Sequence, residues 1–338
     1  MGAIIVVDGL WGDAGKGKIT GYLCKKHNPS LCIRAGIGPN AGHSIYFKEG
    51  SSIILRQIPC GLLNEKTMLR IGSGVTVDPE IFLSEVKKWK LEGRAKLDLR
   101  CPIITNDDKE VERNHPMMIK IDSTKSGCGS ARARFVMREA RQAKDIPELR
   151  EYVTDVAEET NRCADEGIVV IEGTQGTHMS LALSQDYPYV TSDNCTATSF
   201  ADDVGLSWKL IDRVVMLVKC LPTRVGEGPL PDEMSWEEIV ERGLQEYGVN
   251  TGRPRRKAST VDLNRLRYSA MLNGPTEVAL TFCDQYDPSM KDKTNPGNIT
   301  AKLHAFIDKI EQTVKAPVTL LDTGKWFTSI IDLSIREE

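Results

Sequence analysis

Short apolar runs alternate with longer amphipathic stretches along most of the chain. The runs are rich in Val, Ile and Leu, which is typical of buried strands. The stretch 79–91 begins with a proline and is followed by Gly93, which are start and stop signals of a helix. A longer helix is predicted over 147–166, closed by Gly167. The predicted strands are 4–7, 68–71, 168–171, 214–218, 277–282 and 318–321.

This alternation predicts an α/β fold with a mostly parallel central sheet flanked by helices. Nearly every predicted strand is followed by glycine and polar or charged residues: GLWGDAGKGK, GSGV, EGTQGT, LPTRVGEGP, CDQYD and DTGK. One such loop would be an ordinary turn. However, ligands of open α/β sheets bind beyond the carboxyl ends of the strands. The series therefore predicts one composite site, and we expect one catalytic domain over 1–338.

The first of these loops is a near match to a phosphate-binding loop. Residues 9–20 read GLWGDAGKGKIT, whereas the usual pattern is G-x-x-x-x-G-K-[ST]. Gly15 and Lys16 supply the GK pair, but Leu10 replaces the first glycine and Gly17 replaces the Ser or Thr that would bind magnesium. A strand before the loop and a helix that starts near position 18 would still aim backbone N–H groups at an anion.

The loop also contains an acid, Asp13. A carboxylate at this place would repel phosphate unless it holds a metal or takes a proton. The segment NAGH, which ends in His43, offers a possible acid or charge stabiliser, although a lone histidine is more often structural. These two residues predict chemistry at a phosphate and not only its binding.

Further loops suit a nucleotide and a dicarboxylate. STKSGCG at 123–129 suits a phosphate monoester, and Gln175 in EGTQGT suits the edge of a base. TGRPRRK at 251–257 fits a dicarboxylate, because the arginine fork matches carboxylate geometry; the alternative is a nucleic-acid patch. Asp284 in TFCD can accept from N1–H and the 2-amino group of guanine. DTGK at 322–325 closes that base pocket or is a simple turn.

Composition narrows the class of protein. The formal net charge is −3, which gives no general attraction to nucleic acid or to an anionic membrane. The chain lacks an apolar run that could span a bilayer, a charged signal-peptide start and a myristoylation signal. Its nine cysteines are scattered without a C-x-x-C pair, which favours reduced thiols over disulfides or zinc. We therefore expect a cytoplasmic enzyme that binds neither nucleic acid nor membrane.

The whole set of motifs resembles the adenylosuccinate synthetase family, most closely its short archaeal form. The resemblance runs in order from about residue 4 to residue 324. It implies a homodimeric ligase that joins L-aspartate to C6 of a 6-oxopurine nucleotide with GTP, or with ATP if the base pocket differs, and with Mg²⁺. The oxo group is first phosphorylated, which requires removal of the proton from N1. The motifs are WGDAGKGK, NAGH, STKSGCG, EGTQGT, YPYVTS, PTRVGEGP, TGRPRR and LTFCDQYD.

The resemblance also implies a role for individual residues. Asp13 would be the general base and a magnesium ligand together with the Gly42 carbonyl, while His43 and Lys16 would act on the transferring phosphoryl group. Acceptor contacts would be Asn40, Ser123, Thr124, Arg138 from the partner subunit, Gln175, Thr191 and Arg253. Aspartate contacts would be Thr251, Arg253 and Arg255. Donor contacts would be Gly12, Gly15, Lys16, Gly17, Gly42, His43, Asp284 and Gly324.

Several departures from the family lie near the acceptor base. Ala14 replaces a usual Glu, while Asp122 and Lys125 replace usual glycines. A viral branch of the family uses dGMP to make a 2-aminoadenine precursor, and FC before Asp284 resembles that branch. Asp122, or space left by Ala14, would accommodate the 2-amino group, unless Asp122 only pairs with Lys125. We therefore expect dGMP as the acceptor, in a host cytoplasm if the protein is viral, with IMP as the alternative.

Two other functions fit parts of the pattern. A nucleoside monophosphate kinase would need the GK pair and an acceptor site, but not the arginines of TGRPRRK. A nucleotide-binding regulator without turnover is conceivable because of Ala14. Retention of Asp13, Lys16 and His43 together argues against it.

Overall fold

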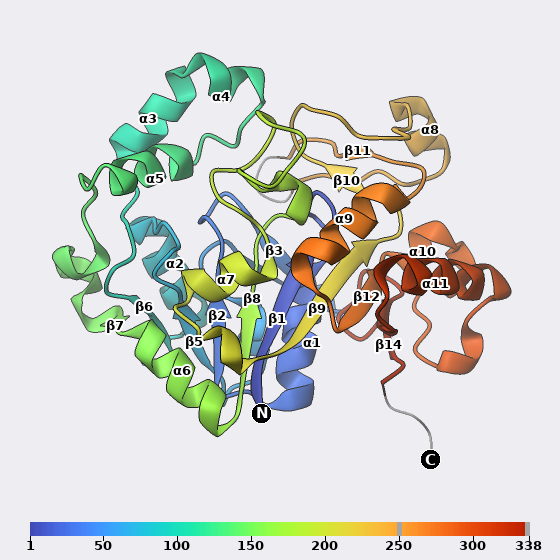
Figure 1. The fold of residues 1–338 in the computed structure, drawn as a ribbon, viewed down its shortest axis with the longest axis horizontal. Coiled ribbons are helices and arrows are strands. Elements are labelled where there is room, and N and C mark those ends of the chain that lie inside the picture. The colour runs from blue at the N-terminus through green and yellow to red at the C-terminus, as the bar shows by residue number, and fades with distance from the viewer. Residues whose placement is uncertain (249–251, 335–338) are drawn as a thin grey trace.

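A ten-stranded sheet forms the centre of the molecule (Figure 1). The computed structural model describes residues 1–248 and 252–334. Neighbouring strands are parallel except β13 and β14, which are antiparallel. The order is β14 (Ile330–Asp332), β13 (Val318–Asp322), β12 (Glu277–Thr281), β9 (Ile211–Lys219), β1 (Gly2–Asp8), β8 (Ile168–Glu172), β2 (Leu31–Arg34), β5 (Met68–Ile71), β6 (Ala95–Asp98) and β7 (Val153–Thr154).

Helices cover both faces of this sheet, and two small two-stranded sheets lie outside it. In the described ranges, none of the helices is long and apolar enough to cross a membrane. One is the hairpin of β3 (His43–Tyr46) and β4 (Ser52–Leu55). The other pairs β10 (Thr223–Arg224) with β11 (Arg256–Lys257), which are antiparallel but far apart in the sequence. The α-helices are α1 (Lys16–His27), α2 (Pro79–Trp89), α3 (Asn106–Asn114), α4 (Pro116–Lys120), α5 (Cys128–Val136), α6 (Val156–Glu166), α7 (Ala197–Asp203), α8 (Trp236–Glu241), α9 (Leu263–Asn273), α10 (Cys283–Tyr286) and α11 (Ala301–Val314).

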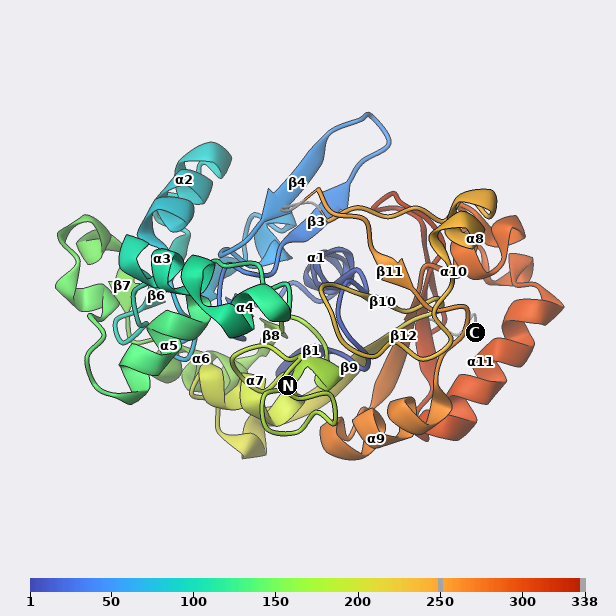
Figure 2. The ribbon, with the colours of Figure 1, turned by 90° about the horizontal axis from the view of Figure 1, so that it is seen from above.

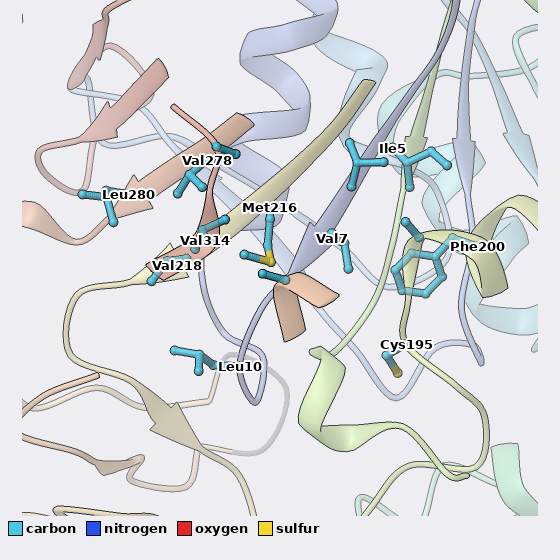
Figure 3. Close-up of a cluster of buried hydrophobic side chains, with 14 of the residues drawn as sticks. Ile5, Val7, Leu10, Cys195, Phe200, Met216, Val218, Val278, Leu280 and Val314 are labelled. Carbon is cyan, nitrogen blue, oxygen red and sulfur yellow. The ribbon is translucent and has the colours of Figure 1, made fainter. Parts of the chain in front are cut away.

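The central strand β1 separates two hydrophobic cores. Successive side chains of a strand point to opposite faces. Ile5 and Val7 therefore join a core with Phe200 of α7 and residues of α6, α9 and α11 (Figure 3). Ile4 and Val6 join the other core, with residues of α1 and α2. All seven residues of β1 are buried, which explains why its sequence is a continuous apolar run and does not alternate.

The carboxyl end of β1 lies at the point where the order of the sheet reverses. The chain passes from β1 through α1 to β2 on one side of β1, and later from β8 to β9 on the other side. Such a switch point opens a crevice for ligands at the strand ends. Viewed from above, this edge is surrounded by the β3–β4 hairpin, helices α3 to α5 and the β10–β11 pair (Figure 2).

Each of the six predicted strands is confirmed, with small shifts at their ends. The predicted helix over 147–166 is confirmed over its second half, including its end at Gly167, and is wrong over 147–155. A short 3₁₀ turn, Pro147–Tyr152, leads into β7, and α6 begins only at Val156. The β-branched pair Val153–Thr154 extends the edge of the sheet by pairing with β6. Asp155 then caps α6, since its side chain accepts from the Glu158 N–H at 3.0 Å.

Candidate active site

A cavity of about 500 Å³ lies at the carboxyl edge of the sheet. The loops that follow β1, β2, β8, β12 and β13 contribute to its lining, together with the segments around 122–129 and 187–192. The structure thus brings together most of the residues predicted from the sequence. Those that line the cavity are Gly12, Asp13, Gly15, Lys16, Gly17, Asn40, Gly42, His43, Ser123, Thr124, Gln175, Thr191, Arg255, Asp284 and Gly324.

Three predicted residues are not placed in the lining. Arg138 follows the end of α5, is exposed, and donates to the carbonyl of Val136 at 2.9 Å. Arg253 forms an ion pair with Asp122 instead. Thr251 lies outside the described residues. A role for Arg138 would therefore have to come from another copy of the chain.

The phosphate loop is held from below by Asp8, the last residue of β1. Its carboxylate accepts from the Leu10 N–H at 2.7 Å and lies 3.4 Å from the Lys16 ammonium. Lys16 also donates to the carbonyl of Gln175. Gly15 adopts a positive φ of 79° and caps α1, which starts at Lys16 and not near position 18. The amino end of α1 and the Lys16 ammonium are thus placed together at the base of the loop, as anion binding requires.

Asp13 lies against the loop that carries the arginines. Its φ is 54°, a left-handed conformation that aspartate tolerates. Arg255 Nε lies 2.5 Å from Asp13 Oδ2, although in the described part of the chain no hydrogen bond reaches that oxygen. The acid of the phosphate loop and a guanidinium suited to a carboxylate ligand therefore share one side of the cavity.

Asp122 makes a parallel contact with the same arginine loop. Its carboxylate lies 2.5 Å from Arg253 Nη1, so the suggested pairing with Lys125 is not the one observed. Asp122 and Lys125 both have a φ of 53°. Glycine adopts this conformation most easily, and aspartate tolerates it better than most residues. The backbone thus keeps a glycine-like path at both positions.

His43 belongs to a buried charge cluster at the end of β8. Its Nδ1 bonds to Glu172, and Arg34 Nη1 lies 2.5 Å from the same Glu172 oxygen. Burial, together with the charge of Arg34, lowers the pKa of His43 to about 4. Burial opposes ionisation of Glu172, but its bonds with His43, Arg34 and the Cys60 N–H outweigh this and lower its pKa to about 2. Glu172 therefore fixes the ring through Nδ1 and leaves Nε2 for a ligand.

The sequence has clear relatives among known proteins. The adenylosuccinate synthetase family model matches residues 5–149 and 145–294. The adenylosuccinate synthetase of Pyrococcus horikoshii is 45% identical over 98% of both chains, and that of Methanocaldococcus jannaschii is 46% identical over 97% of this chain and 96% of its own. The chain belongs to the adenylosuccinate synthetase family. It is accordingly a carbon–nitrogen ligase that depends on a nucleoside triphosphate.

Two solved structures of synthetases share its fold. The fully ligated adenylosuccinate synthetase from Plasmodium falciparum has a TM-score of 0.90 at 21% identity, and covers 98% of this chain and 100% of its own. The succinoaminodeoxyadenylate synthetase of cyanophage S-2L, bound to dGMP and to dATP as an energy donor, has a TM-score of 0.82 at 26% identity, with 98% and 95% covered. The architecture is therefore that of a single adenylosuccinate synthetase domain.

The sequence alone did not single out Lys18 and Glu172. Lys18 is buried in α1 of this synthetase fold, and its ammonium bonds to Asp322 at 2.6 Å and to the carbonyl of Gly324 at 2.8 Å. It thus fixes the loop after β13 to the phosphate loop. The available signal was the charge itself: Lys18 follows a phosphate loop, and Glu172 ends a strand that is otherwise apolar.

The end of the synthetase cavity nearest β12 is the one suited to a donor base. Asp284 lines it on α10, and burial, followed by the charge of Asp322, raises the pKa of Asp284. Phe282 precedes it with a φ of 57°, which ends β12 one residue earlier than predicted. A base that donates two hydrogen bonds would favour the ionised form of Asp284.

Two groups of residues could attract a metal. His43, Cys60 and Glu172 offer ligand atoms within 4.8 Å of one another, but the Arg34 guanidinium already supplies the positive charge there. Asp13 offers a buried carboxylate oxygen that accepts no hydrogen bond from the described residues. Carboxylate and carbonyl oxygens are the ligands that Mg²⁺ prefers. Asp13 and Gly42 both line the cavity, whereas of the other group only His43 does, so Asp13 and the Gly42 carbonyl are the better fit for magnesium. An ion there would displace the Arg255 guanidinium, which lies 2.5 Å from Asp13 Oδ2.

Asp203 of α7 predicts a pH-dependent stability. Its carboxylate accepts from the Gly36 N–H at 2.8 Å, and burial, with the charge of Asp193, raises its pKa to about 7. The unfolded chain releases this proton at a lower pH, so wild type loses stability as pH rises toward about 7. We expect Asp203→Asn to remove roughly 2–3 kcal/mol of the loss between about pH 5 and about pH 8. Urea unfolding at both pH values measures it.

The matched control is Asp202→Asn, because Asp202 is the exposed neighbour on the same helix. Asp202 makes the smallest of the five contributions to the pKa of Asp203, so this variant should keep most of the wild-type pH dependence. The account of Asp203 is wrong if the two variants lose stability equally between the two pH values.

Proposed function

We propose that this synthetase joins L-aspartate to C6 of IMP, with GTP as the phosphoryl donor. The contact between Arg255 and Asp13 at 2.5 Å carries the proposal. A guanidinium fork suits the carboxylates of aspartate. It is placed beside the acid of the phosphate loop, where a second substrate would meet a nucleotide activated by phosphoryl transfer. A monophosphate kinase would need no arginine for a dicarboxylate substrate.

The residues of the cavity divide the chemistry between them. Asp13 would take the proton from N1, so that the C6 oxygen can attack the γ-phosphoryl group of GTP. The bond from the γ-phosphorus to the bridging oxygen breaks, and GDP leaves. Lys16, with the amino end of α1, would neutralise the phosphate charge. A phosphoryl group beside His43 would raise its pKa, so Nε2 could carry a proton toward that group. The amine of aspartate would then displace phosphate from C6.

Magnesium would be held by Asp13 and the Gly42 carbonyl. When bound, it would polarise the phosphoryl oxygens and shield their charge.

IMP is proposed as the acceptor in place of dGMP. Archaeal relatives at 45–46% identity are adenylosuccinate synthetases, whereas the dGMP-bound phage enzyme is 26% identical. The Asp122 carboxylate, which would have read the 2-amino group of dGMP, is paired with Arg253. Ala14 packs in the core and also lines the cavity itself, so the space left by Ala14 is the remaining argument for dGMP. dGMP thus becomes the alternative acceptor.

A homodimer is proposed from the position of Arg138. This residue is exposed at the end of α5, beside the apolar side chains of Val136 and Met137, which are 59% and 65% exposed. Apolar residues that remain exposed next to an unused arginine suit an interface with a second copy. The partner would place Arg138 at the phosphate of the acceptor.

The acceptor preference can be measured with purified protein, Mg²⁺, L-aspartate and GTP. Parallel reactions contain IMP, GMP or dGMP, and the products are separated and identified by mass. We expect a succinylated product from IMP, with a kcat/KM at least about a hundredfold above that for dGMP, since a lost or misplaced base contact costs a few kcal/mol.

The variant Asp122→Gly should keep this preference, because Asp122 serves Arg253 and not the base. Product from dGMP alone would contradict IMP as the acceptor. A reversal of the preference in Asp122→Gly would contradict the assignment of Asp122.

A further inference from the structure

A buried charge cluster lies between the donor-base end of the cavity and the arginine loop. It consists of Lys219 at the end of β9, Glu246, Lys257 of β11 and Gln285 of α10. Lys219 Nζ lies 2.6 Å from Glu246 Oε2, and Lys257 bonds to the other oxygen of the same carboxylate. Lys257 Nζ also donates to Gln285 Oε1 at 2.5 Å. Both lysines are fully buried.

Two lysines on one carboxylate are more than ion pairing needs. Lys219 alone would neutralise Glu246, and a second buried ammonium carries a desolvation cost. Burial lowers the pKa of Lys257 to about 8, in spite of Glu246. What Lys257 adds is the bond to Gln285. The burial of the Lys257 ammonium is therefore better explained by its hydrogen bond to Gln285 than by a gain in stability.

One end of the cluster reaches the part of the cavity lining formed by Phe282, Asp284 and Gln285, which we call the donor-base wall. Gln285 lines the cavity directly after Asp284. The Lys219 ammonium lies 4.1 Å from the centre of the Phe282 ring, which also lines the cavity. A base that packs on Phe282 and Asp284 would therefore fix α10. It would also fix Gln285 Oε1, which accepts the hydrogen bond from Lys257.

The other end of the cluster reaches the arginine loop. The carbonyl of Glu246 accepts from the Arg255 N–H at 2.8 Å. Lys257 follows Arg255 by two residues, and its backbone lies opposite Thr223 in the antiparallel β10–β11 pair. Lys219 Nζ donates to the Thr223 hydroxyl at 2.9 Å. The backbone that aims Arg255 is thus bonded to the same cluster as the donor-base wall.

We propose that Lys257 is a positioning residue that couples the donor base to L-aspartate. Through Glu246 and Gln285 it holds the arginine loop in register with α10, so that a bound donor base orders Arg255 for aspartate. This inference rests on the ligase function proposed above. Because such coupling is reciprocal, aspartate must also tighten the binding of the donor.

The test is the affinity for a non-hydrolysable GTP analogue, measured by calorimetry with and without saturating L-aspartate, with IMP present throughout. We expect aspartate to tighten binding to wild type by about tenfold. In Lys257→Met, which keeps the length of the side chain, the factor should fall to about one, while the affinity for IMP stays within about twofold. A factor that survives in a folded Lys257→Met protein overturns the proposal.

Two further variants keep the test decisive. Gln285→Leu breaks the same bond from the other side and should abolish the coupling even if Lys257→Met does not fold. Lys302→Met is the matched control, because Lys302 donates to the Tyr286 carbonyl of α10 at 2.8 Å from the solvent side. Lys302→Met should keep the coupling. Loss of the coupling in this control would mean that any change near α10 abolishes it, and would overturn the role of Lys257.

The outcomes also separate this inference from the function on which it rests. Wild type that makes no succinylated product contradicts the proposed function. Wild type that makes the product but binds the analogue equally with and without aspartate contradicts only the coupling.

Discussion

Replacing Asp13 with Asn is expected to lower kcat by about a thousandfold, since a positioned general base contributes about 10²–10⁴ in rate. Asparagine cannot take the N1 proton and is a poorer magnesium ligand. The substitution should not disturb the loop. Position 13 has a φ of 54°, and asparagine tolerates this left-handed conformation well. The affinity for IMP should therefore stay within a few-fold. Steady-state kinetics and calorimetric titration with IMP measure the two effects.

The matched control is Asp122→Asn. Asp122 is also an acid with a positive φ that pairs with an arginine of the same loop. The same change there should cost less than about tenfold in kcat, because no proton transfer is assigned to it. An Asp13→Asn enzyme that retains a tenth of the wild-type kcat would show that Asp13 is not the base.

The second large effect is expected from Arg255→Met. Loss of hydrogen bonds to a charged partner costs about 1.5–3 kcal/mol each, so the KM for L-aspartate should rise by about a hundredfold. The KM for IMP should change little, because Arg255 is not among the predicted acceptor contacts. The measurement is the KM for each substrate at saturating levels of the others.

Arg256→Met provides the control for the loss of a guanidinium from the neighbouring residue, the first of β11. Arg256 pairs with Glu233 and donates to the carbonyls of Gly226 and Gly228. Its own side chain does not line the cavity, although Glu227 between the two glycines does. This variant is expected to leave the KM for aspartate within a few-fold. If both variants raise the KM for aspartate equally, the effect comes from a change in the loop and not from the contact of Arg255 with a carboxylate.

The sequence predicts best what depends on neighbours along the chain. Apolar runs locate the strands, because buried parallel strands have no need of polar positions. The departure at the phosphate loop identifies Asp13 because strand, loop and helix are contiguous. The first half of the predicted helix over 147–166 shows the limit. There Val153–Thr154 joins β6 through a tertiary contact that no local pattern encodes.

Residues with distant partners could not be predicted in the same way. Glu172 meets Arg34 and His43 from 138 and 129 residues away, and Lys18 meets Asp322 from 304 residues away. Asp122 was expected beside a base, but the fold brings Arg253 to it. In each case the partner decides whether a charge is structural or chemical, and only the arrangement of the sheet brings the partner near.

The central claim is that the C6 oxygen of the acceptor leaves as phosphate. IMP labelled with ¹⁸O at C6 tests this directly, in a reaction with GTP, Mg²⁺ and L-aspartate. Mass spectrometry of the inorganic phosphate should show one ¹⁸O for each molecule of succinylated product. Phosphate that carries no label would mean that GTP is hydrolysed without activation of the base, and would contradict the mechanism.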